Sequence, residues 1–203
     1  MSTERFDVKA ATWDADPDKL TQAGEVAGAI RAAVPLNRSM RLLEYGAGTG
    51  LVSQGLAGSV GPLTLADNSA GMRAVMQAKV ASGALMNARV WDLDLQARPV
   101  PADTFDLIVT SLVLHHVRDL DSVLAGFAQL LVPGGYLAVA DLDAEDGSFH
   151  DHDFDGHHGF DRDELAGRLT SAGFADVRMQ DCTRIDRDGT GYSVFLATAR
   201  RTE

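Results

Sequence analysis

The stretch Leu42 to Gly50, LLEYGAGTG, places three glycines at alternate positions directly after an apolar run. Gly46, Gly48 and Gly50 permit backbone angles that side chains forbid, and they allow a ligand to approach the main chain closely. In an open parallel sheet, ligands bind where a strand turns into a helix, at the carboxyl ends of the strands. The stretch therefore predicts a ligand loop, although a tight turn without a ligand is an alternative that the glycines alone leave open.

The rest of the chain alternates short apolar strands with helical periodicity. Strands are expected within residues 40–45, 61–67, 85–93, 104–114 and 134–142, and helices within residues 17–34, 51–57, 69–80 and 119–131. This alternation predicts a parallel sheet with helices on both faces. After a capped helix that begins at Asp161, two long strands flank Asp188-Gly189, a typical hairpin turn. Residues 1 to about 16 are expected to form a polar lead-in.

Composition bounds the class of protein. The chain has 203 residues, 45% of them hydrophobic and 23% charged, which predicts one globular domain. A net charge of −11 argues against a nucleic-acid partner, because such binding depends on Lys and Arg. The apolar runs are shorter than the roughly 20 residues of a membrane span. The charged N-terminal sequence and the single Cys182 favour a cytoplasmic protein in a reducing compartment.

Two carboxylates narrow the range of ligands that the loop could bind. Asp67 ends the second strand, where it is placed to accept hydrogen bonds from both ribose hydroxyls of a nucleoside, unless it is only a solvated carboxylate. Dinucleotide loops have the spacing G-x-G-x-x-G, whereas this loop has G-x-G-x-G preceded by Glu44. A carboxylate there would repel a pyrophosphate and would suit a ligand that carries an ammonium or sulfonium cation, such as S-adenosylmethionine.

On these motifs the chain resembles the class I S-adenosylmethionine-dependent methyltransferases. LLEYGAGTG is similar to the first motif of that family, LADNS at residues 65–69 to its acidic loop, and FDLIVTSLVLHHV at residues 105–117 to its fourth motif. The resemblance implies a doubly wound, Rossmann-like α/β fold with a seven-stranded, mostly parallel sheet and a C-terminal antiparallel hairpin. It also implies a single domain, with an N-terminal lid and helix (1–35), a cofactor-binding core (36–145) and an acceptor-side loop, helix and hairpin (146–203).

The resemblance assigns S-adenosylmethionine as the cofactor and implies which residues bind it. The methionine part would contact the glycine loop, the ribose Asp67, and the adenine the segments around Asn68 and Asp92. The full set is Trp13, Glu44, Tyr45, Gly46, Ala47, Gly48, Gly50, Asp67, Asn68, Ser69, Met72, Asp92, Leu93, Thr110 and Ser111. For Trp13, simple packing is an equal alternative.

Histidines are the candidates for catalysis. His115 and His116 follow the fourth strand, and SFHDHDFDGHHGFDRDEL at residues 148–165 contains His150, His152, His157 and His158. His116, His157 and His158 are predicted to act as bases or hydrogen-bond donors to the acceptor. The alternative is structural, with the loop merely covering the pocket. A metal site is not expected, because the spacing matches no fixed ligand motif.

The sequence thus predicts a methyltransferase that acts on a small molecule, as a monomer or homodimer. The absence of an Asn-Pro-Pro-Tyr signature and of a large additional binding domain favours a small acceptor. Two other functions stay open at this point: a nicotinamide-dependent oxidoreductase, and a non-catalytic module that binds S-adenosylmethionine.

Overall fold

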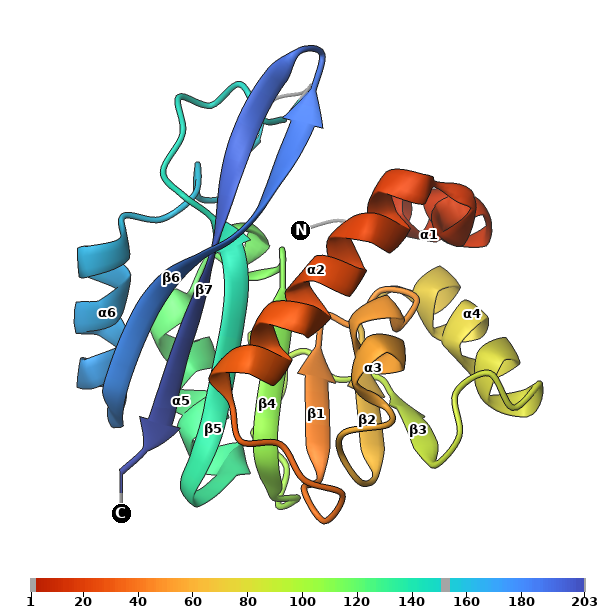
Figure 1. The fold of residues 1–203 in the computed structure, drawn as a ribbon, viewed down its shortest axis with the longest axis horizontal. Coiled ribbons are helices and arrows are strands. Elements are labelled where there is room, and N and C mark those ends of the chain that lie inside the picture. The colour runs from red at the N-terminus through yellow and green to blue at the C-terminus, as the bar shows by residue number, and fades with distance from the viewer. Residues whose placement is uncertain (1–2, 151–153, 203) are drawn as a thin grey trace.

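The structure, a computed structural model, describes residues 3–150 and 154–202. One seven-stranded sheet has the order β3-β2-β1-β4-β5-β7-β6 (Figure 1). Its strands are β1 Leu42–Tyr45, β2 Leu63–Ala66, β3 Ala88–Trp91, β4 Phe105–Ser111, β5 Leu131–Leu142, β6 Phe174–Arg187 and β7 Thr190–Arg201. β7 runs antiparallel to both of its neighbours, and the other paired strands are parallel. The predicted doubly wound fold with a C-terminal hairpin is confirmed.

Helices cover both faces of this sheet. The helical elements are α1 Glu4–Lys9, η1 Ala10–Ala15, α2 Pro17–Ala33, α3 Leu51–Leu56, α4 Ala70–Ala81, η2 Leu114–His116, α5 Leu120–Leu130 and α6 Arg162–Ser171. α2, α3 and α4 bury side chains such as Ile30 and Met76 against one face. α5 and α6 bury Phe127 and Leu169 against the other face (Figure 1). The sheet is therefore shielded from water on both sides, as a mostly parallel sheet requires.

Side-chain caps mark the starts of α2, α4 and α6. Asp16 accepts a hydrogen bond from the backbone of Asp18 at the start of α2, where Pro17 takes the first helical position. Ser69 caps α4, and Asp161 caps α6 through two backbone N–H groups. These local signals fix where each crossover helix begins, and so how the loops at the strand ends are shaped.

Two local predictions were wrong. The expected polar lead-in contains α1 and η1, because Ala10 is buried and the segment packs on α4. The fifth strand begins at Leu131, three residues earlier than predicted, so Pro133 lies within it. The pairing with β4 shifts register between Phe105 and Leu107, and this irregular stretch accommodates the proline.

The strand order reverses between β1 and β4, and this reversal positions the site. From β1 the chain winds outward through β2 and β3, whereas β4 and β5 extend the sheet on the other side. The loops that follow β1 and β4 therefore diverge and leave a crevice at the carboxyl edge of the sheet. Within the described ranges, the helices are too short or too polar to cross a membrane.

Candidate active site

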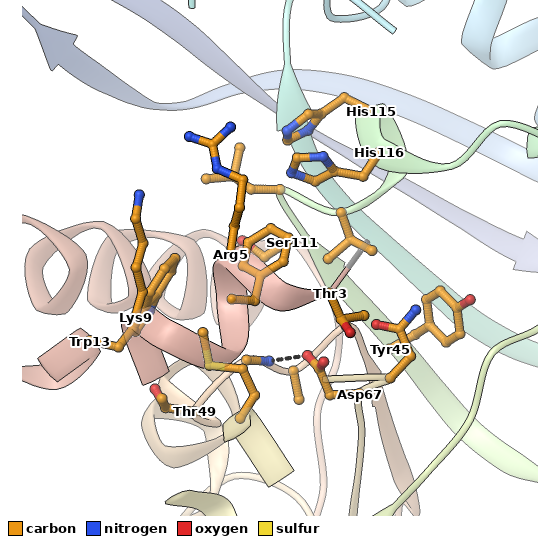
Figure 2. A pocket seen from close by; sticks show the side chains of 18 of the residues that line it. Thr3, Arg5, Lys9, Trp13, Tyr45, Thr49, Asp67, Ser111, His115 and His116 are labelled. Carbon is orange, nitrogen blue, oxygen red and sulfur yellow. Dashed lines mark hydrogen bonds between the residues drawn. The ribbon is translucent and has the colours of Figure 1, made fainter. Parts of the chain in front are cut away.

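A cavity of about 620 Å³ lies at the carboxyl ends of β1, β2 and β4. The glycine loop, the loop after β2 and the loop after β4 form its floor and one wall. α1 and η1 contribute Phe6 and Trp13, among others, and the hairpin contributes Arg187. Figure 2 shows the N-terminal segment facing the histidine pair across this space. The volume is in the usual range for a small-molecule site.

The glycine loop adopts a conformation that side chains disfavour. Gly46, Gly48 and Gly50 have φ angles of 70°, 56° and 81°. A Cβ on Gly46 would lie 2.3 Å from a methyl carbon of Val113, so this position also excludes a side chain by contact. The glycines therefore shape the loop and bring the β4 loop against it.

Glu44 is a buried carboxylate beside this loop. Its side chain is 2% exposed and accepts a hydrogen bond of 3.0 Å from the backbone N–H of Ser53 in α3. Burial raises the pKa of Glu44 from 4.5 to about 7, and the nearby Asp67 adds to the effect. The cavity therefore contains a carboxyl group that a bound cation would stabilise in its ionised form.

Asp67 joins two loops of the cavity. One carboxylate oxygen accepts a 2.8 Å hydrogen bond from the backbone of Gly48, the contact dashed in Figure 2, and the other accepts a 2.8 Å bond from the backbone of Ser69. Burial raises the pKa of Asp67 in spite of these bonds. Each oxygen keeps a second lone pair, so the group retains capacity to accept further hydrogen bonds at the cavity surface.

Most of the predicted cofactor residues meet at the cavity. Those that line it are Trp13, Glu44, Tyr45, Gly46, Ala47, Gly48, Asp67, Asn68, Met72, Leu93 and Ser111. Four others do not line it. Gly50 begins α3, Ser69 caps α4, and Thr110 is fully buried within β4.

Asp92, predicted to contact the cofactor, is the fourth, and the structure places it outside the cavity lining. Its carboxylate faces Arg73 at 3.3 Å and Arg98 at 3.1 Å, away from the cavity. Asp94 lines the cavity in its place, and one of its oxygens accepts a 3.3 Å hydrogen bond from the side chain of Asn68. The sequence WDLD contains both carboxylates, so the motif located the loop but could not choose between them.

The loop after β4 begins with a strained residue and delivers the histidine pair. Leu112 has a φ of 55°, which is costly for a branched side chain, and its backbone N–H bonds to Ala140 in β5. His115 is 2% exposed, and its Nδ1 lies 2.6 Å from Asp141, a carboxylate with no exposed surface. His115 and His116 line the cavity, and Figure 2 shows their rings side by side.

The histidine-rich loop divides between the cavity and its outer side. His150 lines the cavity and stacks on Phe154, with 3.6 Å between ring centroids. His157 and His158 do not line it, contrary to prediction. The backbone of His157 bonds to His115, and His158 faces Glu145 at 3.3 Å.

The reason is the path of the loop, which returns to β5 through a bridge between Asp143 and Phe160. This path turns the His157–His158 pair away from the ligand space. Asp151, His152 and Asp153 of the same motif lie outside the described residues.

Sequence reasoning missed the N-terminal lid contacts. Asp7 in α1 accepts hydrogen bonds from the Ser69 hydroxyl at 2.5 Å and from the Gly71 backbone at 2.8 Å. Asp14 in η1 pairs with Lys79 at 2.6 Å and accepts a 2.5 Å bond from another loop residue, Thr49. Two carboxylates thus hold the segment over the cavity. The resemblance implied a lid within residues 1–35 but not the contacts that hold it.

Comparison with known proteins identifies the family. Residues 20–179 match the model of a methyltransferase domain. The chain belongs to the class I S-adenosylmethionine-dependent methyltransferase family. It is 34% identical over 153 residues to the biotin biosynthesis bifunctional protein BioCD of Bordetella avium. The aligned stretch covers 70% of this chain and 30% of that protein. The chain spans 3% to 54% of the length of the curated relatives compared.

Solved structures of methyltransferases share the fold. A Haloferax volcanii protein in complex with the Trm112 methyltransferase activator superposes with a TM-score of 0.77 at 17% identity, over 98% of each chain. The N-methyltransferase NodS of Bradyrhizobium japonicum, in complex with S-adenosylhomocysteine, superposes with a TM-score of 0.74 at 18% identity, again over 98% of each chain. These likenesses establish the architecture of the family and leave the acceptor open.

The contacts of Asp7 predict that the lid depends on one carboxylate. Asp7→Ala removes both hydrogen bonds to the start of α4, so we expect faster amide hydrogen exchange across residues 4–15. Hydrogen exchange with peptide mass spectrometry measures this. Asp18→Ala, an exposed carboxylate on α2, is the control. Equal exchange in the Asp7 variant and the wild type would contradict the role of Asp7.

Proposed function

We propose that the protein binds S-adenosylmethionine in this cavity and transfers its methyl group to a small acceptor that carries a negative charge. The observation that carries the cofactor assignment is the pair of carboxylates at the glycine loop, Glu44 and Asp67, both at the cavity and both with a raised pKa. A ligand with a cationic centre and a nucleoside diol satisfies both. Membership of the family supports this assignment.

Each part of the cofactor has a matching surface. The ammonium and sulfonium groups would lie near Glu44, where a buried carboxylate attracts positive charge. The ribose hydroxyls would donate to Asp67. The adenine would lie near Met72 and Leu93, with Asp94 and Asn68 at the same end. These residues bind and orient, and the lid with Trp13 excludes water.

Methyl transfer is a displacement at carbon. The bond between the methyl carbon and the sulfonium sulfur breaks as the acceptor atom forms its own bond to carbon, and the sulfur keeps the electron pair of the broken bond. Alignment of the two partners contributes up to about 7–11 kcal/mol to lowering the barrier in favourable cases. The chain therefore needs to hold the acceptor in line, at the open side of the cavity where His116 and Ser111 lie.

The cofactor assignment is tested by calorimetry. We expect S-adenosylhomocysteine to bind and NADH not to bind. Asp67→Ala should weaken S-adenosylhomocysteine binding by roughly 10–100-fold, because charge-assisted hydrogen bonds contribute about 1.5–3 kcal/mol. Asp92→Ala is the matched control, because Asp92 lies outside the cavity. This variant should bind S-adenosylhomocysteine with the affinity of the wild type. NADH binding would support the oxidoreductase alternative instead.

Affinity for the cofactor should depend on pH through Glu44. The free protein has a pKa of about 7 at this group, and a bound cation lowers it, so binding favours the ionised form. S-adenosylmethionine affinity should therefore fall about tenfold from pH 8 to pH 6. Glu44→Gln keeps an oxygen that accepts the hydrogen bond from Ser53. This variant should bind S-adenosylmethionine more weakly at pH 8, and its affinity should not change between pH 6 and pH 8. A variant that retains the wild-type slope would exclude Glu44 as the cause.

The charge of the acceptor is inferred from the basic side chains around the cavity. Arg5, Lys9, Lys19 and Arg187 line it, although the chain as a whole has a net charge of −11. Burial and the nearby Arg187 lower the pKa of Lys19, so these cations repel one another at close range. These side chains come from α1, α2 and β6, and their positive charge favours an acceptor with a carboxylate, phosphate or phenolate group.

Turnover with a substrate panel tests the acceptor and distinguishes an enzyme from a binding module. Small carboxylic acids, phenols and phosphate esters should be methylated faster than their neutral analogues. Lys19→Met should raise KM for such an acceptor about tenfold, with a smaller change in kcat, and Lys19→Arg should restore it. A preference for neutral acceptors would overturn the charge assignment, and no turnover with any compound would favour the non-catalytic module.

A further inference from the structure

Three histidines from two separate segments meet at one wall of the cavity. His115 and His116 lie on η2 after β4, and His150 lies on the loop after β5, 34 residues further along the chain. One ring nitrogen of each lies within 4.8 Å of the corresponding nitrogens of the other two. The ring centroids of His150 lie 5.5 Å from those of both other histidines.

A buried carboxylate orients the first of these imidazoles. Asp141, at the end of β5, has no exposed surface and lies 2.6 Å from Nδ1 of His115. It also accepts backbone hydrogen bonds from Leu114 and Leu142 at 2.9 and 2.8 Å. The Asp141 carboxylate is therefore held in place, and it directs the Nδ1–H of His115 toward itself. Nε2 of His115 is left with its lone pair available to a ligand.

We propose that His115, His116 and His150 bind one divalent transition-metal ion of the zinc class. Imidazole nitrogen is a preferred ligand of such ions, and three protein ligands are usual where a metal takes part in chemistry. The carboxylate behind His115 matches the outer-shell partner that metal-binding histidines typically have. Tetrahedral Zn–N bonds of about 2.0–2.1 Å place ligand atoms about 3.4 Å apart. Binding would therefore require the partly exposed His116 and His150 to rotate toward His115.

The fourth coordination position would face the cavity. All three histidines line it, and the aromatic rings of Phe6 and Phe154 flank them. An oxygen of the acceptor is the ligand that this position would take, because the metal would stabilise the anionic form that attacks the methyl group. This last step rests on the proposed function, whereas the metal site itself does not.

Metal binding by the whole chain tests the proposal. The protein is prepared without a histidine tag, stripped with a chelator and titrated with Zn²⁺ by calorimetry and with Co²⁺ by visible absorption. We expect one ion per chain and a Co²⁺ spectrum typical of tetrahedral or five-coordinate nitrogen and oxygen ligation. His116→Ala and His150→Ala should each weaken binding at least tenfold, and Asp141→Asn about 10–100-fold.

His158→Ala is the matched control, because His158 lies on the same loop and outside the cavity. Its affinity should equal that of the wild type. No binding by the wild type, unchanged binding in His150→Ala, or an equal loss in His158→Ala would overturn the proposal. Circular dichroism confirms that each variant is folded. S-adenosylhomocysteine titrations of the same samples report separately on the proposed function.

Discussion

The carboxylate of Asp67 is the contact on which the site depends. It bonds to the glycine loop through Gly48 and to its own loop through Ser69, whose hydroxyl in turn donates to Asp7 in the lid. One continuous chain of hydrogen bonds thus connects the ends of β1 and β2 with α1. The parallel sheet brings these segments to one edge, and this polar chain sets their spacing.

The same arrangement destabilises the folded protein electrostatically. Glu44 and Asp67 are both buried, and burial raises the pKa of both; the charge of Asp67 further raises the pKa of Glu44, and the charge of Asp7 further raises that of Asp67. In the free protein, stability is therefore lost as pH rises from the ordinary pKa of Glu44 at 4.5 through its folded value of about 7. A cationic ligand would offset this cost, so the folded protein should be less stable without such a ligand. Lys19 and Arg187 also line the cavity, and in the proposed function they favour a negatively charged acceptor.

The fold and the loops that line the cavity could be predicted from the sequence because their signals are local. Glycine spacing, strand and helix periodicity, and caps such as Ser69 and Asp161 are each encoded within a few residues. The helical structure of residues 4–15 was not predicted, for the opposite reason: the segment is largely polar, and Asp7 and Asp14 stabilise it by contacting loops far along the chain. The choice between Asp92 and Asp94 likewise depended on Arg73 and Arg98.

The sequence by itself determined the family, the α/β sheet with its final hairpin, and the loops that surround the ligand space. Only the tertiary structure decided which histidines share a wall. The prediction placed His157 and His158 at the acceptor because the resemblance puts the segment between the fifth strand and the next helix beside the pocket. The bridge from Asp143 to Phe160 turns them away and leaves His150 beside His115 and His116. Such a cluster has no spacing to recognise in a sequence, since it exists only where two loops from adjacent strands meet.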